Sequence, residues 1–204
     1  KAMDLDLSAL TPVERSVLAA WWERAAADEH ASVASFSRVV LDLMSLGAPA
    51  ALLVDATEAL ADEIQHARAC FSVASALQGA HVGAGPLAIG GSLDGTADPA
   101  RILIDTLVGG AIGESQASAR AFAAAEAAVS PQLRDLLARI SVDEARHAAL
   151  AWRTAQWILE RHPALHGLAA RVLAHASDTA TVPIPGAPAG WGALSPEAVQ
   201  EIHH

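Results

Sequence analysis

The chain has 204 residues, 52% of them hydrophobic and nearly a quarter of them alanine, so one all-α domain over residues 1–204 is predicted. Its formal net charge is −10 and no basic cluster occurs, which argues against nucleic acid as a partner because the phosphates would be repelled. Lys1 is the only lysine, which excludes a P-loop lysine or an internal Schiff base.

Capping residues, prolines and glycines divide the chain into four long helical segments. Thr11 and Glu14 form a capping-box pattern before the first segment, and Gly47 and Gly79 are natural stops after the first and second. A proline opens the third segment and another opens the fourth. The expected helices cover residues 12–46, 49–78, 99–129 and 131–162.

The connections between these segments predict a four-helix bundle. The first two segments are joined by a very short link, as are the last two, so each pair must be antiparallel. The glycine-rich stretch from Gly79 to Asp98 can span roughly 66 Å when extended, more than the length of a long helix. It is expected to cross over along the bundle. A short fifth helix over residues 164–176 and an extended tail, with a turn at 196–202, are expected to follow.

Two copies of Glu-x-x-His and two single glutamates indicate a metal-binding site. Residues three apart on a helix share a face, so each motif directs a carboxylate and an imidazole inward. All of these residues fall near the midpoints of the four segments, where four carboxylates and two imidazoles can bind two divalent metal ions. They are Glu29, Glu63, His66, Glu114, Glu144 and His147.

An aspartate precedes the glutamate of each motif. Asp143 is expected to orient His66, and Asp62 to orient His147, because a metal-bound imidazole usually donates its other N–H to a carboxylate. The alternative is that both aspartates are surface charges. For the glutamates themselves the alternative is also a solvent-facing position, but apolar and small residues flank them, and a buried carboxylate without a partner would cost several kcal/mol.

Glycines precede the glutamate of the third segment. Gly109, Gly110 and Gly113 indicate close packing, a distorted turn, or space beside the metals for O2 or a substrate. If the space is a substrate pocket, a bulky residue at Gly110 should block turnover and spare metal binding. Cys70 lies one turn after His66, but a buried free cysteine is usually inert packing.

The ligand pattern resembles the ferritin-like dimetal-carboxylate superfamily, which includes bacterioferritins, rubrerythrins, manganese catalases and di-iron oxygenases. The resemblance covers residues 12–162 and implies that the six residues above are the ligands, with Glu63 and Glu144 as bridges or chelates. The chain lacks the Cys-x-x-Cys pairs of rubrerythrin, and it has no tyrosine for a stored radical. Its long crossover and proline-rich tail are unlike a compact bacterioferritin subunit.

The resulting expectation is a non-haem di-iron oxidase or monooxygenase that activates O2 to oxidise a small organic substrate. Glu29, Glu63, Glu114 and Glu144 would be its catalytic carboxylates, the cofactor two iron ions with manganese possible, and the electron source a separate reductase or the substrate. The alternatives are a ferroxidase of the bacterioferritin storage type and a manganese catalase. A monomer or homodimer is expected.

Cysteine content and hydropathy bear on location. The single cysteine, Cys70, allows no intramolecular disulfide, which fits a reducing cytoplasm. No signal peptide is recognised, and the longest uncharged run, residues 69–93, is broken by Gln78, His81 and several glycines. A cytoplasmic protein without a membrane partner is therefore expected.

Overall fold

The computed structural model describes residues 2–91, 97–175 and 187–194. Within these residues the regular structure is helical and includes no strand, which confirms the all-α class. No helix in this part of the chain is long and apolar enough to cross a membrane. The elements are α1 (Pro12–Ser45), α2 (Ala50–Gln78), α3 (Pro99–Asp105), the π-helix η1 (Thr106–Gly113), α4 (Glu114–Glu126), α5 (Pro131–Arg161), the 3-10 helix η2 (Pro163–Leu165) and α6 (His166–His175).

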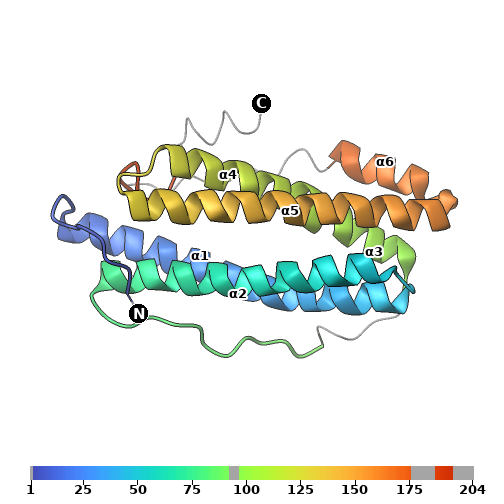
Figure 1. The fold of residues 1–204 in the computed structure, drawn as a ribbon, viewed down its shortest axis with the longest axis horizontal. Helices are drawn as coiled ribbons and strands as arrows, with labels where there is room; N and C mark the ends of the chain where they lie inside the picture. The colour runs from blue at the N-terminus through green and yellow to red at the C-terminus, as the bar shows by residue number, and fades with distance from the viewer. Residues whose placement is uncertain (1, 92–96, 176–186, 195–204) are drawn as a thin grey trace.

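The long helices lie side by side (Figure 1). Helix α1 packs against α2 and runs antiparallel to it, and α4 packs in the same way against α5. The two pairs meet through α2 and α5, and η1 also packs on α5. Residues 79–91 leave the end of α2 and turn back along it, and the backbone N–H of Val82 donates to Ser75 Oγ at 3.0 Å.

The predicted caps set the helix boundaries. Glu14 N–H donates to Thr11 Oγ1 at 3.3 Å, and Thr11 N–H donates to the Glu14 carboxylate at 2.8 Å, which completes the capping box of α1. Gly79 ends α2 with φ of 71°, a conformation that glycine adopts without steric cost. Ser130 caps α5 by accepting from Leu133 N–H. Local sequence therefore explains where these helices begin and end.

The third segment differs from the prediction of one continuous helix over residues 99–129. It is α-helical to Asp105, π-helical over Thr106–Gly113, and α-helical again from Glu114 to Glu126. The π-helix contains all three glycines, which stabilise an α-helix least among residues other than proline. π-Helical turns are frequent at functional sites, and this one ends directly before Glu114. The fifth helix begins as η2 and continues as α6.

Two apolar regions flank the middle of the helices. One is centred on Leu18, Trp22 and Leu133, and the other on Phe36 and Leu150. A third apolar group joins α3, η1, α5 and α6. Buried Glu63, His66, Glu144 and His147 belong to none of these groups, so charged side chains interrupt an otherwise apolar interior.

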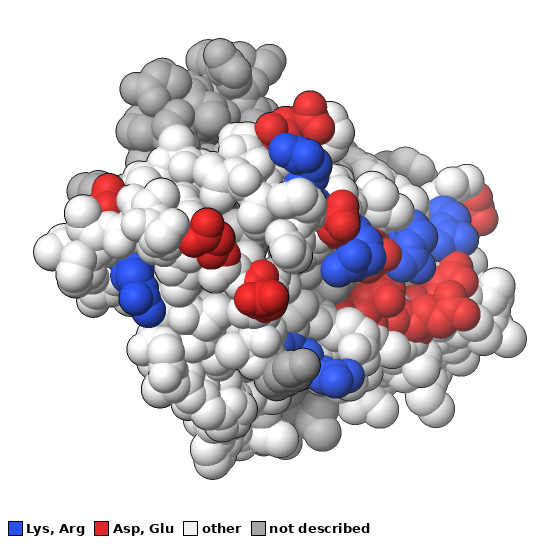
Figure 2. Space-filling model, turned by 60° about the vertical axis from the view of Figure 1, so that its left-hand side comes forward, with Lys and Arg blue, Asp and Glu red and all other residues white. Residues whose placement is uncertain are grey.

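Charged side chains of both signs lie close together on the surface. On the face in Figure 2 the blue basic side chains on the right gather beside red acidic ones, while two others lie apart on the left and at the bottom. Ion pairs between helices include Arg153 with Asp55 at 2.8 Å and Arg146 with Asp62 at 3.1 Å. Exposed pairs of this kind contribute little stability each.

Residues 187–194 pack on the apolar core rather than extending away from it. Trp191 is 5% exposed, and its carbonyl accepts a hydrogen bond from Trp22 Nε1 at 2.8 Å. Gly192 has φ of +97°, and a Cβ placed there would lie 2.5 Å from Trp22 Cζ2. The extended tail is therefore wrong for these eight residues. The turn expected at 196–202 lies outside the described residues.

Substituting alanine for Gly192 should lower the free energy of unfolding by about 2–4 kcal/mol, through backbone strain and overpacking against Trp22. Urea unfolding followed by circular dichroism measures this. Gly85→Ala is the matched control, because its new Cβ would meet nothing within 4 Å. Equal stability of the Gly192→Ala and Gly85→Ala proteins would show that this segment does not pack on Trp22.

Candidate metal centre

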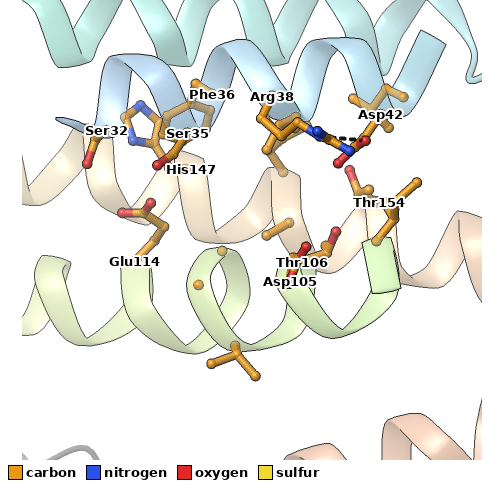
Figure 3. Close-up of a pocket in the computed structure, with 18 of the residues that line it drawn as sticks. Ser32, Ser35, Phe36, Arg38, Asp42, Asp105, Thr106, Glu114, His147 and Thr154 are labelled. Atoms are coloured by element: carbon orange, nitrogen blue, oxygen red, sulfur yellow. Dashed lines mark hydrogen bonds and ion pairs between the residues drawn. The ribbon is translucent and has the colours of Figure 1, made fainter. Parts of the chain in front are cut away.

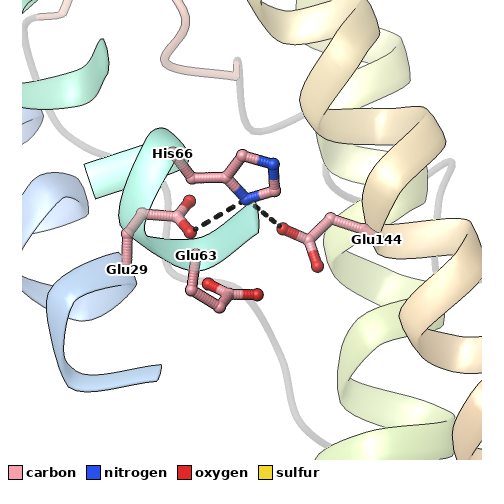
Figure 4. A group of neighbouring side chains, drawn as sticks. All are labelled: Glu29, Glu63, His66 and Glu144. Carbon is pink, nitrogen blue, oxygen red and sulfur yellow. Dashed lines mark ion pairs between the residues drawn. The ribbon is translucent and has the colours of Figure 1, made fainter. Parts of the chain in front are cut away.

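The structure brings all six predicted ligands together from four helical segments. Four of them are almost fully buried, and Glu29 and Glu114 are partly exposed. Figure 4 shows Glu29, Glu63, His66 and Glu144 converging from α1, α2 and α5. Glu114, the first residue of α4, and His147 of α5 complete the set. The six residues lie at a similar height along the helices because each is near the middle of its own helical segment.

Two groups of ligand atoms overlap at Glu144. Glu29, Glu63, His66 and Glu144 each offer one atom within 4.8 Å of the others, and Glu114, Glu144 and His147 do the same. Glu144 Oε1 lies 3.3 Å from His66 Nδ1, and its Oε2 lies 3.2 Å from His147 Nδ1. Glu63 Oε1 also lies 3.1 Å from His147 Nδ1. Glu63 and Glu144, the two carboxylates that were expected to be shared, thus each have oxygen atoms close to both groups.

Each imidazole contacts an aspartate on the opposite helix. His66 Nε2 lies 3.1 Å from Asp143 Oδ2, and His147 Nε2 lies 3.3 Å from Asp62 Oδ2. Both predicted contacts are present. An ionised carboxylate only accepts hydrogen bonds, so the Nε2 proton points to the aspartate. The Nδ1 atoms therefore face the glutamates, which is the orientation a metal ligand needs.

Arg146 is a part of the site that the sequence reasoning missed. Its Nη2 donates to Asp62 Oδ2 at 3.1 Å and also to Asp143 Oδ1. One guanidinium thus joins the two aspartates that hold the two imidazoles. The available signal was a basic residue three positions after Asp143, a spacing at which helix side chains meet. Its second contact, to α2, depends on how the helices pack.

Burial and mutual repulsion shift the protonation of the site. Burial raises the pKa of Glu63 to about 7 and that of Glu114 to about 9, and neighbouring carboxylates add to both shifts. Burial opposes protonation of the histidines, but hydrogen bonds to carboxylates outweigh it and raise the pKa of His66 to about 11 and of His147 to about 10. At Glu144 burial is likewise outweighed, by the hydrogen bond to His147 and the close contact with His66, and the pKa falls.

The donor atoms fit a metal ion. His66 Nδ1 is buried without a hydrogen-bond partner among the described residues, although Glu29 Oε2 lies 3.5 Å from it and Glu144 Oε1 3.3 Å. A divalent cation would accept its lone pair and neutralise the carboxylates. Carboxylate oxygens with imidazole nitrogens suit first-row divalent metals, including iron and manganese. The buried cluster could therefore hold metal.

Metal binding should strengthen as pH rises from about 6 to 8, because ligands must lose their protons before they bind metal. The raised pKa values of His66, His147 and Glu114 mean that these groups carry protons near neutral pH in the metal-free protein. Calorimetric titration with Mn(II) in two buffers of different ionisation enthalpy measures the released protons. An affinity independent of pH, together with the same binding enthalpy in both buffers, would contradict this assignment.

A cavity of about 620 Å³ adjoins the site (Figure 3). Glu114 and His147 line one end, and Gly109 and Gly110 line its wall. A Cβ at Gly109 would meet nothing within 4 Å, whereas one at Gly110 would lie 2.7 Å from the Ala151 Cβ. The glycines therefore serve all three predicted purposes: the distorted turn η1, close packing at Gly110, and open space at Gly109.

The packing at Gly110 argues against one expectation. A bulky residue there would push η1 away from α5, the helix that carries two of the predicted ligands, so we now expect it to disturb metal binding as well. Gly109 is the better position for blocking the cavity. Cys70 is 2% exposed, and burial raises the pKa of its thiol well above the ordinary value, which fits inert packing rather than a thiolate ligand.

Comparisons of the chain with protein families, with curated proteins and with solved structures found no match. The function of the chain must therefore be inferred from its donor atoms and the adjoining cavity.

Proposed function

We propose that the chain is a ferritin-like four-helix bundle, with residues 79–98 crossing over between α2 and α3, and that it binds two metal ions to oxidise a small organic substrate with O2. The observation that carries this proposal is the pair of overlapping ligand groups that share Glu144. A second is the cavity beside Glu114 and His147. Iron is the preferred metal and manganese the alternative.

The six ligands take different roles in this proposal. Glu29 and His66 would bind one ion, and Glu114 and His147 the other, with Glu63 and Glu144 between them. When bound, a pair of iron ions supplies electrons for the reduction of O2, and a separate reductase or the substrate replaces them. The carboxylates can balance the changing charge by shifting their mode of binding.

The surrounding residues would orient the ligands and exclude water. Asp62 and Asp143 hold the imidazoles through Nε2, so that Nδ1 stays directed at the metals. The ring of Phe36 lies 5.0 Å from that of His147 and covers it with an apolar surface. A dry environment keeps a reactive oxidant from side reactions with solvent.

The cavity favours substrate oxidation over the two alternatives. Its volume of about 620 Å³ falls in the range of sites for small organic ligands, and neither O2 nor hydrogen peroxide needs such a space. A ferroxidase takes iron itself as substrate, so it would gain nothing from an apolar cavity. We also propose that the protein is a cytoplasmic enzyme. It would work as a monomer or homodimer and not as a subunit of a storage shell.

The test is anaerobic loading with Fe(II), followed by a pulse of O2 and sizing of the assembly. The proposal expects a small assembly that consumes O2 in proportion to the iron in its sites and accumulates no iron core. A large hollow particle that fills with iron would establish the storage alternative. Rapid evolution of O2 from hydrogen peroxide by the manganese-loaded chain would establish the catalase alternative.

A further inference from the structure

The far end of the cavity is polar, and its walls are apolar. Figure 3 places Glu114 and His147 at one end and Arg38, Asp42 and Thr154 at the other. The apolar residues that line the cavity include Phe36, Val39, Leu43, Ile102, Leu150 and Ala151. Ser32 and Ser35 lie beside Glu114 and His147, so the cavity has polar groups at both ends and apolar side chains in its walls. A molecule with an apolar body fits these walls, and a polar head group can bond at the end away from Glu114 and His147.

Thr154 supplies an unused hydrogen-bonding group at the polar end. Its side chain is 2% exposed, and its Oγ1 has no hydrogen-bond partner among the described residues. A threonine within a helix can satisfy its hydroxyl on the carbonyl four residues earlier, but this one does not. A buried hydroxyl without a partner is costly. It can donate to, or accept from, a ligand in the cavity.

Charged side chains at this end of the cavity are paired with one another. Arg38 Nε donates to Asp42 Oδ1 at 2.9 Å, and Arg101 Nη2 donates to the same oxygen at 2.8 Å. Arg101 Nη1 also donates to Asp105 Oδ2 at 2.7 Å. The guanidinium groups of Arg38 and Arg101 are thus engaged by carboxylates, which makes them less available to an anionic head group. A neutral head is favoured.

The length of the cavity limits the size of the ligand. Thr154 lies two helical turns after His147 on α5, which corresponds to a separation of about 10 Å along the helix. A chain of medium length can therefore have its head at Thr154 and its other end near Glu114 and His147.

We propose that the cavity binds a neutral amphiphile, such as a medium-chain alcohol, with its hydroxyl on Thr154 and its apolar end at Glu114 and His147. That this end is the one oxidised rests on the proposed function. The binding itself requires only the cavity.

The test is calorimetric titration of the full, Mn(II)-loaded chain with octanol, octanoate and octylamine. Octanol should bind more tightly than the two charged analogues. Thr154→Val keeps the shape of the side chain and removes its hydroxyl, so it should weaken octanol roughly five- to tenfold. Thr57→Val is the matched control, because Thr57 is exposed and bonds its own helix at Leu53 O.

The free protein provides a second readout. Because the Thr154 hydroxyl has no partner, Thr154→Val should not lower the midpoint of thermal unfolding in the absence of octanol. A lowered midpoint would show that the hydroxyl is already satisfied and would overturn the assignment. Equal octanol affinity in wild type and Thr154→Val would also overturn it, as would tighter binding of octanoate or the absence of binding by all three probes.

Titration of the metal-free chain separates this inference from the proposed function. If octanol binds with the same dependence on Thr154 and the chain takes up no metal, the cavity assignment stands and the proposed oxidation fails. If metal binds and octanol does not, the cavity assignment fails alone.

Discussion

Replacing Glu144 with alanine should abolish binding of both metal ions. Its two oxygens face different imidazoles, His66 at 3.3 Å and His147 at 3.2 Å, so one substitution removes a donor from both ligand groups. Loss of a ligand to only one ion would halve the stoichiometry instead. Metal analysis after reconstitution with Mn(II) or Fe(II) distinguishes these results.

The control for this variant is Glu160→Ala, which removes an exposed carboxylate from the same helix. It should bind metal like the wild type. Circular dichroism of both variants shows whether the helices remain. Retention of the full metal content by a folded Glu144→Ala protein would contradict a shared role for this residue. The double variant Glu63→Ala/Glu144→Ala should likewise bind no metal, because it removes both carboxylates that lie between the groups.

Replacing Asp143 with alanine should weaken metal binding about 10–100-fold without unfolding the protein. Asp143 holds His66 through Nε2 at 3.1 Å but lies outside the ligand groups. Its loss frees the imidazole to rotate and also removes a contact of Arg146, whose other contact is Asp62. Titration with Mn(II) under a competing chelator measures the change in affinity.

Asp135→Ala is the comparison for this prediction, since Asp135 is exposed on the same helix. If Asp143→Ala and Asp135→Ala bind metal equally well, Asp143 is a surface charge. Arg146→Ala extends the test, because loss of the guanidinium should weaken binding less than loss of Asp143 does. The imidazole contacts of both aspartates would remain in that variant.

Much of this site follows from local sequence. Helix caps such as Thr11 and Ser130 place the boundaries, and the boundaries place the midpoints where the ligands lie. Residues three apart share a helix face, so each Glu-x-x-His motif points inward as a unit. The crossed contacts of Asp62 and Asp143 follow from their position about 100° around the helix from the glutamates.

The remaining features depend on contacts between elements that are distant in the sequence. The π-helix η1 contains three glycines, of which Gly110 packs against Ala151 of α5. The glycines in the sequence indicated packing, distortion or open space without deciding among them. The burial of Trp191 involves a hydrogen bond from Trp22 Nε1 to the Trp191 carbonyl, and these two residues are far apart in the sequence. The polar end of the cavity joins Asp42 of α1 to Thr154 of α5, and neither residue belongs to a recognisable motif.

The metal content of the wild-type chain tests the central claim most directly. After anaerobic reconstitution with Fe(II) and removal of unbound iron, the six converging ligands predict close to two equivalents of iron per chain. A content of one equivalent or less would contradict a centre for two metal ions.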